Sequence, residues 1–199
     1  MDDIPDWLTS TLASDATGGS GVLPLWIRPL KQDTRAIGPA FIVLTGNDDN
    51  LAVRETIQSP PPIGSILVVG GASTSRTAII GELLALEMHN AGIVALVTDG
   101  LVRDSREIRQ MQPFCVWCRG ITPIASNKSK HAEGVGSISI GGVLIRDNDL
   151  VIADDDGIVI WPREHIDTVL EKAEEKFKQD NKRLARLQQR MGNSGESKS

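Results

Sequence analysis

The sequence predicts an α/β fold in which sheet and helix are stacked in layers, followed by one long C-terminal helix. Three observations support this prediction: a strand–helix–strand unit near the middle of the chain, a second half rich in short strands, and a charged amphipathic stretch after Pro162. An α/β half joined to a β-rich half favours layers of sheet and helix over a doubly wound sheet.

In the first half, the apolar run at 40–44 predicts a short strand, and a helix is expected at 50–57. Either Asn47 or Asp49 can cap this helix, because short polar side chains accept hydrogen bonds from first-turn amides. Three consecutive prolines follow and end the helix, since proline has no amide hydrogen to donate. The small, polar residues at 1–21 indicate a loosely ordered arm or a short helix.

The strand–helix–strand unit spans 66–98. Buried strands are expected at 66–69 and 93–98, with a helix at 78–91 between them and Gly92 at its C′ position. Strands connected in this way are parallel. The apolar side of the helix is expected to carry Ile80, Leu83, Leu84 and Met88.

The second half predicts short strands at 114–117, 121–124, 137–140, 143–145, 150–153 and 157–161. The last two are expected to pair across Asp154-Asp155-Asp156-Gly157. That acidic run resembles a cation-binding loop, but it lacks the alternating ligands and terminal Glu of an EF-hand. Asp-Gly between two apolar runs indicates a hairpin turn instead.

Residues 1–162 are expected to form the domain, and 163–191 one long charged helix. Its apolar residues follow steps of four and three, which is typical of a helix that docks on another surface. They are Ile166, Leu170, Ala173, Phe177, Leu184, Leu187 and Met191. The surface can belong to the domain itself or to a neighbouring subunit. Residues 192–199 are expected to be a disordered tail.

The composition excludes several classes of protein. A net charge of −5 and a pI near 5.2 argue against a nucleic-acid partner. No apolar stretch approaches the length of a membrane span and the first ten residues are acidic, so no membrane association and a cytoplasmic location are expected. Cys115 and Cys118 form a CxxC, but residues three apart on a strand face opposite sides and can neither bridge nor share a metal.

Two segments are the most informative about chemistry: the one that begins at Gly81 and the one that follows the second buried strand. Gly81 lets a ligand approach the backbone, and the amides of Leu83 and Leu84 can point at a bound anion. Arg103 can hold a carboxylate or an enolate oxygen, and Asp104 can hold a hard cation. The residues alone leave a structural alternative open, in which Asp104 caps a helix beginning at 105 and Glu82 is an exposed first-turn carboxylate.

Residues 37–162 resemble the RraA-like family, which contains 4-hydroxy-4-methyl-2-oxoglutarate aldolases, oxaloacetate decarboxylases and a non-catalytic regulator of ribonuclease E. The resemblance rests on these pieces: Gly38-Pro39-Ala40, Asp49-Asn50-Leu51-Ala52, Gly70-Gly71, GELLALEMHNAGIVALVTDGLVRD at 81–104, Gly141-Gly142-Val143 and Ala153-Asp154-Asp155-Asp156-Gly157. The aldolase signature is an acidic residue, twenty intervening residues and Arg-Asp, and the spacing of Glu82 to Arg103-Asp104 matches it.

The resemblance implies a three-layer β/β/α swivelling domain that assembles into homotrimers or hexamers. It implies Mg²⁺ or Mn²⁺ bound by Asp104 and waters, with Glu82 orienting a metal-bound water. The GELL backbone (Gly81, Glu82, Leu83 and Leu84) and Arg103 would hold the pyruvyl half of a small 2-keto acid. Cleavage through a metal-stabilised enolate would then release pyruvate, by aldol cleavage, by oxaloacetate decarboxylation or by both.

Two departures bear on this expectation. The aldolases usually carry Asp where this chain has Glu82, and the extra methylene displaces the carboxylate by about 1.5 Å. The regulator branch lacks the Asp of Arg-Asp, so Asp104 favours an enzyme over the alternative, a non-catalytic regulator that binds a protein partner. A neighbouring subunit's C-terminal region supplies a further acidic residue in some aldolases, and Glu174 and Glu175 are both candidates. A methyltransferase is disfavoured, because no glycine-rich loop for S-adenosylmethionine is visible.

Overall fold

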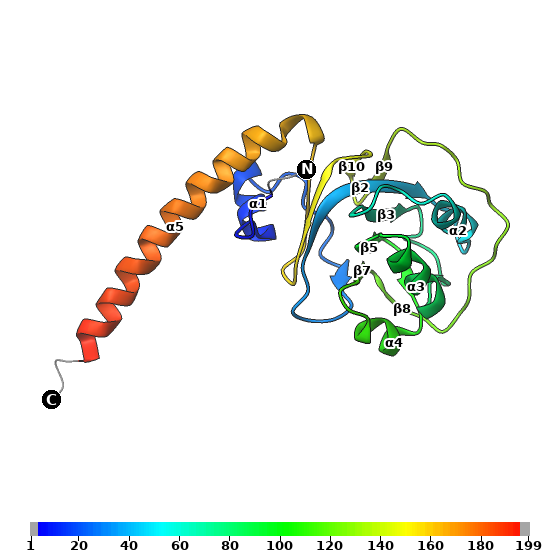
Figure 1. Ribbon diagram of the computed structural model, residues 1–199, viewed down its shortest axis with the longest axis horizontal. Helices are drawn as coiled ribbons and strands as arrows, with labels where there is room; N and C mark the ends of the chain where they lie inside the picture. The colour runs from blue at the N-terminus through cyan, green and yellow to red at the C-terminus, as the bar shows by residue number, and fades with distance from the viewer. Residues whose placement is uncertain (1–3, 196–199) are drawn as a thin grey trace.

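A seven-stranded sheet with the order β1-β7-β5-β3-β2-β11-β12 runs through the domain (Figure 1). The structure is a computed structural model that describes residues 4–195, with side chains described to residue 189. The strands are β1 (Arg28–Pro29), β2 (Ala36–Leu44), β3 (Ile66–Gly70), β5 (Ala95–Thr98), β7 (Cys115–Cys118), β11 (Leu150–Ala153) and β12 (Ile158–Trp161). β2, β3, β5 and β7 are parallel, as predicted for the central unit, whereas β1, β11 and β12 pair antiparallel at the two edges.

Both faces of the sheet are covered, which gives three layers. One face packs against α2 (Leu51–Gln58), α3 (Glu82–Asn90), α4 (Ser105–Gln110) and a small parallel sheet of β4 (Ala78–Ile80), β6 (Leu101–Val102) and β8 (Gly120–Ile121). The other face packs against the hairpin of β9 (Ile138–Ile140) and β10 (Val143–Ile145). Alternate residues of β3 enter the two cores, which is why this strand has a continuous apolar sequence. The predicted layered α/β fold is confirmed.

The helix predicted at 78–91 begins too early. Residues 78–80 are strand β4, which pairs in parallel with β6, and Gly81 is the N-cap of α3. Two β-branched isoleucines favour the strand, where both side chains are buried. The shift moves the helical face, so Leu83 is 75% exposed whereas Leu84 and Met88 enter the core.

The remaining strand and helix predictions agree with the structure to within a few residues, with two differences. β2 begins at Ala36 and not at residue 40, because 36–39 pair with β11. β8 ends at Ile121, before Pro123, and the carbonyl of Ile124 instead accepts from the amide of Ala78 at 2.9 Å. The acidic run forms the expected turn between β11 and β12, closed by a hydrogen bond from the amide of Asp154 to the carbonyl of Gly157 at 3.0 Å.

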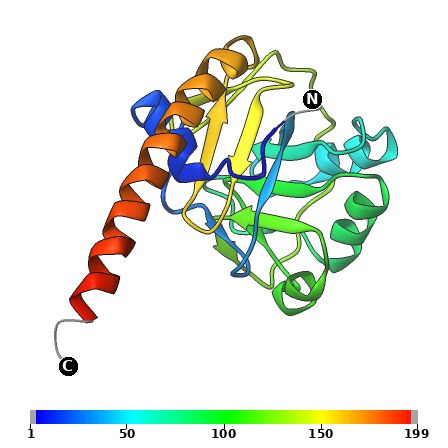
Figure 2. The ribbon, with the colours of Figure 1, turned by 60° about the vertical axis from the view of Figure 1, so that its left-hand side comes forward.

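The C-terminal helix α5 (Ile166–Gly195) follows a short 3₁₀ turn at Arg163–His165 and projects from the domain (Figures 1 and 2). Its first turns dock on α1 (Ser10–Thr17), with Ala173 fully buried and Phe177 stacked on Trp7 at a ring-centroid distance of 4.8 Å. The helix continues through 192–195, where a tail was expected, and residues 196–199 lie outside the described part of the chain.

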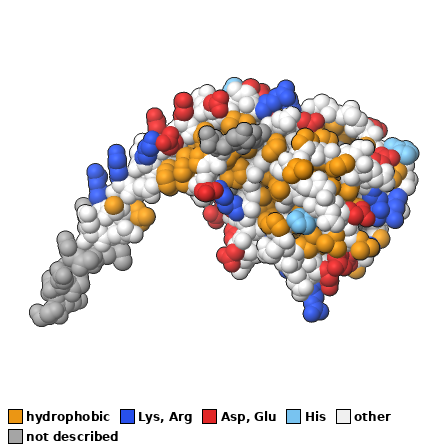
Figure 3. All heavy atoms as spheres, in the orientation of Figure 1, with side chains coloured by type: hydrophobic (Ala, Val, Ile, Leu, Met, Phe, Trp, Pro, Cys, Tyr) orange, Lys and Arg blue, Asp and Glu red, His pale blue; other side chains and the backbone are white. Residues whose placement is uncertain are grey.

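Apolar side chains remain visible along the projecting part of α5 (Figure 3), where Leu184 and Leu187 are about half exposed. Within residues 4–195, none of the helices combines the length and the apolar content that a membrane crossing needs.

Candidate functional site

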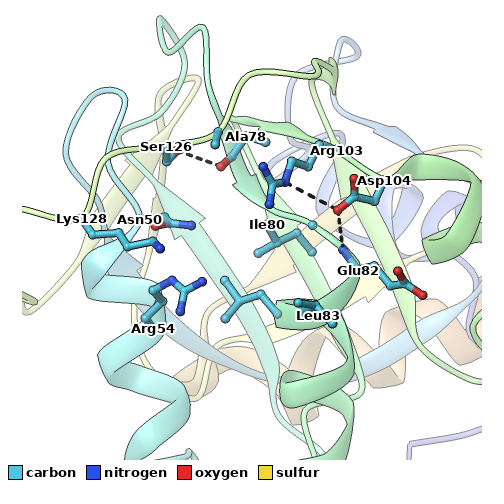
Figure 4. A pocket seen from close by; sticks show the side chains of 13 residues that line it. Asn50, Arg54, Ala78, Ile80, Glu82, Leu83, Arg103, Asp104, Ser126 and Lys128 are labelled. Carbon is cyan, nitrogen blue, oxygen red and sulfur yellow. Dashed lines mark hydrogen bonds and ion pairs between the residues drawn. The ribbon is translucent and has the colours of Figure 1, made fainter.

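A pocket of about 380 Å³ opens where β4 meets the start of α3 (Figure 4). All six residues singled out from the sequence line it: Gly81, Glu82, Leu83, Leu84, Arg103 and Asp104. They are brought together because β4 and β6 pair, so that the residues following each strand meet at one edge. The other lining residues are Asn50, Arg54, Ala78, Ile80, Ala125, Ser126 and Lys128.

Asp104 occupies the position between β6 and α4 with a left-handed backbone, at φ +52°. Its side chain does not cap α4, which removes the capping alternative left open by the sequence. The carboxylate instead crosses to α3, where Oδ2 accepts a hydrogen bond from the amide of Glu82 at 3.1 Å. A single hydrogen bond therefore fixes Asp104 at the wall of the pocket.

Arg103 lies beside this carboxylate. Its amide donates to the carbonyl of Ile80 at 3.0 Å, which ties it to β4, and its Nε lies 3.5 Å from Oδ2 of Asp104. The two side chains are 42% and 43% exposed, so their ion pair is screened by solvent and contributes little to stability. Both groups remain accessible to a small ligand.

Gly81 provides the space that this pair occupies. A Cβ at this position would collide with Oδ2 of Asp104 and would lie 2.8 Å from Nε of Arg103. Its φ of −129° is open to any residue, so the glycine is needed for close approach and not for backbone conformation.

The first turn of α3 presents amides to the same pocket. Within the described chain, the amides of Leu83 and Leu84 donate no hydrogen bond, as expected for a helix start. Because the helix dipole adds partial positive charge at this end, the turn favours an anion.

The acidic groups at the pocket are Asp104 and Glu82. Glu82 is the first residue of α3, and its carboxylate lies on the Asp104 side, away from Arg54 and Lys128 (Figure 4). No cluster of three or more Asp, Glu, His or Cys side chains suited to a metal occurs among the described residues. One or two carboxylates are nevertheless the usual protein share of an Mg²⁺ site, where waters fill the other positions, so this donor set fits Mg²⁺ or Mn²⁺.

Sequence reasoning missed the opposite wall of the pocket. Asn50 and Arg54 lie one turn apart at the start of α2, and that spacing was the available clue. Lys128 also lines the pocket, although the polar sequence around it gave no sign of this. It belongs to the segment 125–132, here called the strap, which passes over the start of α2.

Asp49 holds the strap in place. Its Oδ2 accepts from the amide and the hydroxyl of Ser129 at 2.8 and 2.7 Å, and its Oδ1 accepts from the amide of Leu51 at 2.9 Å. Burial acts to raise the pKa of Asp49, but these hydrogen bonds outweigh it and hold the pKa at about 2. The N-cap position of α2 is Asn50, whose side chain forms no capping hydrogen bond, so the prediction of Asn47 or Asp49 as the cap is wrong. Asp49 instead accepts from the amide of the first helical residue.

The cysteines and histidines lie away from the pocket. Cys115 and Cys118 form no disulfide and face different cores, as predicted, and burial raises the pKa of Cys118 to about 11. His131 lies on the strap, where its Nδ1 is 2.6 Å from Oε1 of Glu55.

The structure is thus a layered α/β domain whose pocket holds an Arg-Asp pair beside a free helix start. The chain belongs to the RraA-like family, because residues 9–160 match the family described as Aldolase/RraA. This confirms the resemblance found in the sequence.

Relatives carry different names. A protein of Halalkalibacterium halodurans named "Putative 4-hydroxy-4-methyl-2-oxoglutarate aldolase" is 34% identical over 180 residues, which cover 88% of this chain and 83% of the relative. The solved structure of the RNA-processing inhibitor RraA from Thermus thermophilis matches with a TM-score of 0.70 and 27% identity, covering 78% of this chain and 93% of that one.

A Geobacillus kaustophilus structure described as an S-adenosylmethionine: 2-dimethylmenaquinone methyltransferase gives a TM-score of 0.70 at 29% identity, covering 77% and 94% of the two chains. The fold is therefore that of RraA. Because the names of the relatives describe different functions, the reaction has to be inferred from the residues of the site.

Proposed function

We propose that this protein is a divalent-metal-dependent lyase that cleaves a C–C bond of a 2-keto acid and releases pyruvate. The observation that supports this most strongly is the Arg103–Asp104 pair at the pocket wall, with Asp104 held by the amide of Glu82. The aldolase name of the Halalkalibacterium halodurans relative points to the same class of reaction.

Arg103 is the electrostatic catalyst in this proposal. In aldol cleavage the C4 hydroxyl loses its proton to water and becomes the carbonyl of the leaving compound. The electron pair of the C3–C4 bond moves into the pyruvyl half, and negative charge collects on the C2 oxygen. A guanidinium already oriented beside that oxygen stabilises the resulting enolate more than the neutral ketone. The free amides of Leu83 and Leu84 would hold the adjacent carboxylate.

Asp104 is the residue that would hold Mg²⁺ or Mn²⁺, and Glu82 would orient one of the waters that complete the coordination. When bound, the metal supplies Lewis-acid polarisation of the keto acid's oxygens. The same electron flow accounts for decarboxylation of oxaloacetate, where the breaking bond joins C3 to a carboxylate and CO₂ leaves in place of a carbonyl compound. Pyruvate forms in both reactions when the enolate carbon takes up a proton.

The test measures pyruvate release from 4-hydroxy-4-methyl-2-oxoglutarate and from oxaloacetate with Mg²⁺, using a coupled reductase, with and without chelator. Asp104→Ala is expected to lose at least about 10²-fold in rate, the cost typical of removing one group that stabilises transition-state charge. Asp156→Ala is the matched control, because Asp156 lies exposed in the β11–β12 turn. The proposal fails if neither substrate gives chelator-sensitive pyruvate above the Asp104→Ala rate.

The second candidate is a regulator that binds a protein partner, favoured by the structural match to an RNA-processing inhibitor. The family resemblance associates regulators with loss of the Asp that is present here as Asp104, which favours the enzyme. A regulator would retain a protein partner on the immobilised chain equally well with Asp104 or Ala at that position. Assembly as a homotrimer or hexamer stays a prediction, to be measured by light scattering.

A further inference from the structure

The segment that connects β8 to β9 runs around the outside of α2 (Figure 1). Its middle part is the strap, which supplies Ser126 and Lys128 to the wall of the pocket (Figure 4). The position of the strap therefore decides whether this wall of the pocket is complete.

The first half of the strap is held to the domain by uncharged groups. The hydroxyl of Ser126 donates to the carbonyl of Ala78 at 2.8 Å. The amide of Asn127 donates to the carbonyl of Asp48 at 2.9 Å, and the carbonyl of Asn127 accepts from the amide of Asn50 at 3.1 Å. Because hydroxyls, amides and carbonyls do not titrate near neutral pH, this end of the strap is attached independently of pH.

The second half of the strap is held by two carboxylates. Asp49 accepts from Ser129, and its pKa of about 2 keeps it ionised near neutral pH. Glu55 of α2 accepts at Oε2 from the amide of Ala132 at 2.7 Å, and its Oε1 lies 2.6 Å from Nδ1 of His131. The amide of Ala132 and the side chain of His131 hold the pKa of Glu55 below its usual range, so Glu55 is ionised as well.

His131 is the part of this attachment that responds to pH. Histidine is the side chain that ordinarily changes its charge between about pH 5 and 8, and the side chain of His131 is 80% exposed to solvent. The protonated ring forms an ion pair with Glu55 only while the strap is in place. Protonation therefore favours the attached strap, and this contribution is lost as the pH rises through that range.

The other charged groups near His131 are of types that ordinarily do not titrate between pH 5 and 8. Around the start of α2 and along the strap they are Asp48, Asp49, Arg54, Lys128, Lys130 and Glu133.

We infer that the strap is a pH-dependent closure of the pocket, held shut by the pair of Glu55 with protonated His131 and released as the pH rises from about 6 to about 8. Release frees Lys128 and the residues after it, whereas Ser126 and Asn127 stay attached. An exposed ion pair of this kind shifts an equilibrium by about two- to fivefold, so the strap adjusts access gradually. What the closure regulates rests on the proposed function, but the movement itself does not.

The test is limited proteolysis by trypsin, because the strap carries two cleavage sites of its own, after Lys128 and after Lys130. Proteolysis reports the population of the locally opened chain when opening is fast. Mass spectrometry measures the rate of each cut at pH 6, 7 and 8, divided by the rate for a synthetic peptide of residues 122–137, which removes the pH dependence of trypsin itself. For wild type we expect this ratio to rise about two- to fivefold from pH 6 to pH 8.

Two variants separate the ion pair from other effects of pH. Glu55→Gln leaves the sequence of the strap unchanged, and it should be cut at pH 6 as readily as wild type is at pH 8. His131→Gln should lose the pH dependence at the Lys128 site. Glu87→Gln makes the same charge change at an exposed position of α3 and should behave as wild type. Thermal melting checks that each variant is folded.

The inference is overturned if the wild-type ratio is the same at pH 6 and pH 8. It is also overturned if Glu55→Gln or His131→Gln keeps the wild-type rise. Because the cuts are measured without substrate, the result is independent of catalysis. A rise that depends on Glu55 in a protein that releases no pyruvate counts only against the lyase, and a constant ratio in a protein that releases pyruvate counts only against the closure.

Discussion

Replacing Gly81 by alanine tests whether the Arg103–Asp104 pair is the catalytic centre without altering either residue. The new Cβ would collide with Oδ2 of Asp104 and lie 2.8 Å from Nε and 3.0 Å from Cγ of Arg103. Both side chains are more than 40% exposed, so they can relieve the clash by moving toward solvent. The pair is then displaced by about 1 Å, a misplacement that typically costs about 10²-fold in rate.

The effect of Gly81→Ala on stability should be much smaller. Alanine is a poorer N-cap than glycine and costs about 1 kcal/mol. The weak ion pair adds little, because it is solvent-screened. For a chain of this size, that cost lowers Tm by about 2–4 °C.

The assay pairs pyruvate release with thermal melting of the same preparations. Gly157→Ala is the control, because its Cβ would meet nothing within 4 Å and its backbone is unstrained. We expect a loss of about 10²-fold with a near-normal Tm for Gly81→Ala, and no change for Gly157→Ala. Wild-type activity in Gly81→Ala, with a normal Tm, would refute the role given to the pair.

Three further predictions concern the stability and burial of the fold. The carboxylate of Asp99 accepts hydrogen bonds from the amides of Gly71 and Ala72 at 3.2 and 2.9 Å. Asp99→Ala leaves both donors unpaired, so it should lower the free energy of unfolding, measured in urea, by about 2–5 kcal/mol. A decrease under about 1 kcal/mol would contradict this. The pKa of Asp49 is lowered to about 2, so its stabilising contribution is complete above about pH 4 and is lost as the pH falls toward 2. The difference in unfolding free energy between wild type and Asp49→Asn should shrink across that range, and a constant difference would show that the charge is not responsible. Burial raises the pKa of Cys118 to about 11, so this thiol should resist a disulfide reagent at pH 8 until urea is added; prompt labelling of the native protein would contradict its burial.

Much of the fold could be predicted because its elements have local causes. The run at 66–70 is apolar throughout since both faces of β3 are buried, and Gly92 ends α3 with a φ of +84°. The start of α3 was missed because apolar residues at 78–80 suit either a helix or a strand. Only their pairing with β6 in the folded protein decides for the strand. Leu83 was therefore assigned to the core although it is exposed.

The two walls of the pocket differ in how far the sequence could predict them. Glu82 and the Arg103-Asp104 pair are separated by only twenty residues, a spacing that the sequence shows, and the pairing of β4 with β6 brings them together. Lys128 reaches the pocket only because the strap is held by Asp49, which lies 80 residues before Ser129 in the chain. A contact between residues so far apart in the chain cannot be recognised from a single sequence.

The C-terminal helix α5 was also only partly predictable from the sequence. Its apolar spacing predicted docking, and the part around Ala173 and Phe177 does dock on the N-terminal segment. The same spacing continues through Leu184 and Leu187, which are exposed. Periodicity indicates which face of a helix is apolar, but the length that is covered depends on where the domain ends.

The most direct test of the central claim is exchange of the methyl protons of pyruvate in D₂O, followed by NMR. A site that stabilises the pyruvate enolate during cleavage must also form it from pyruvate, and this measurement requires no knowledge of the natural substrate. We predict Mg²⁺-dependent exchange by wild type that is lost in Asp104→Ala and in Arg103→Met and is kept in Asp156→Ala. Exchange no faster than in buffer with Mg²⁺ alone would contradict the account.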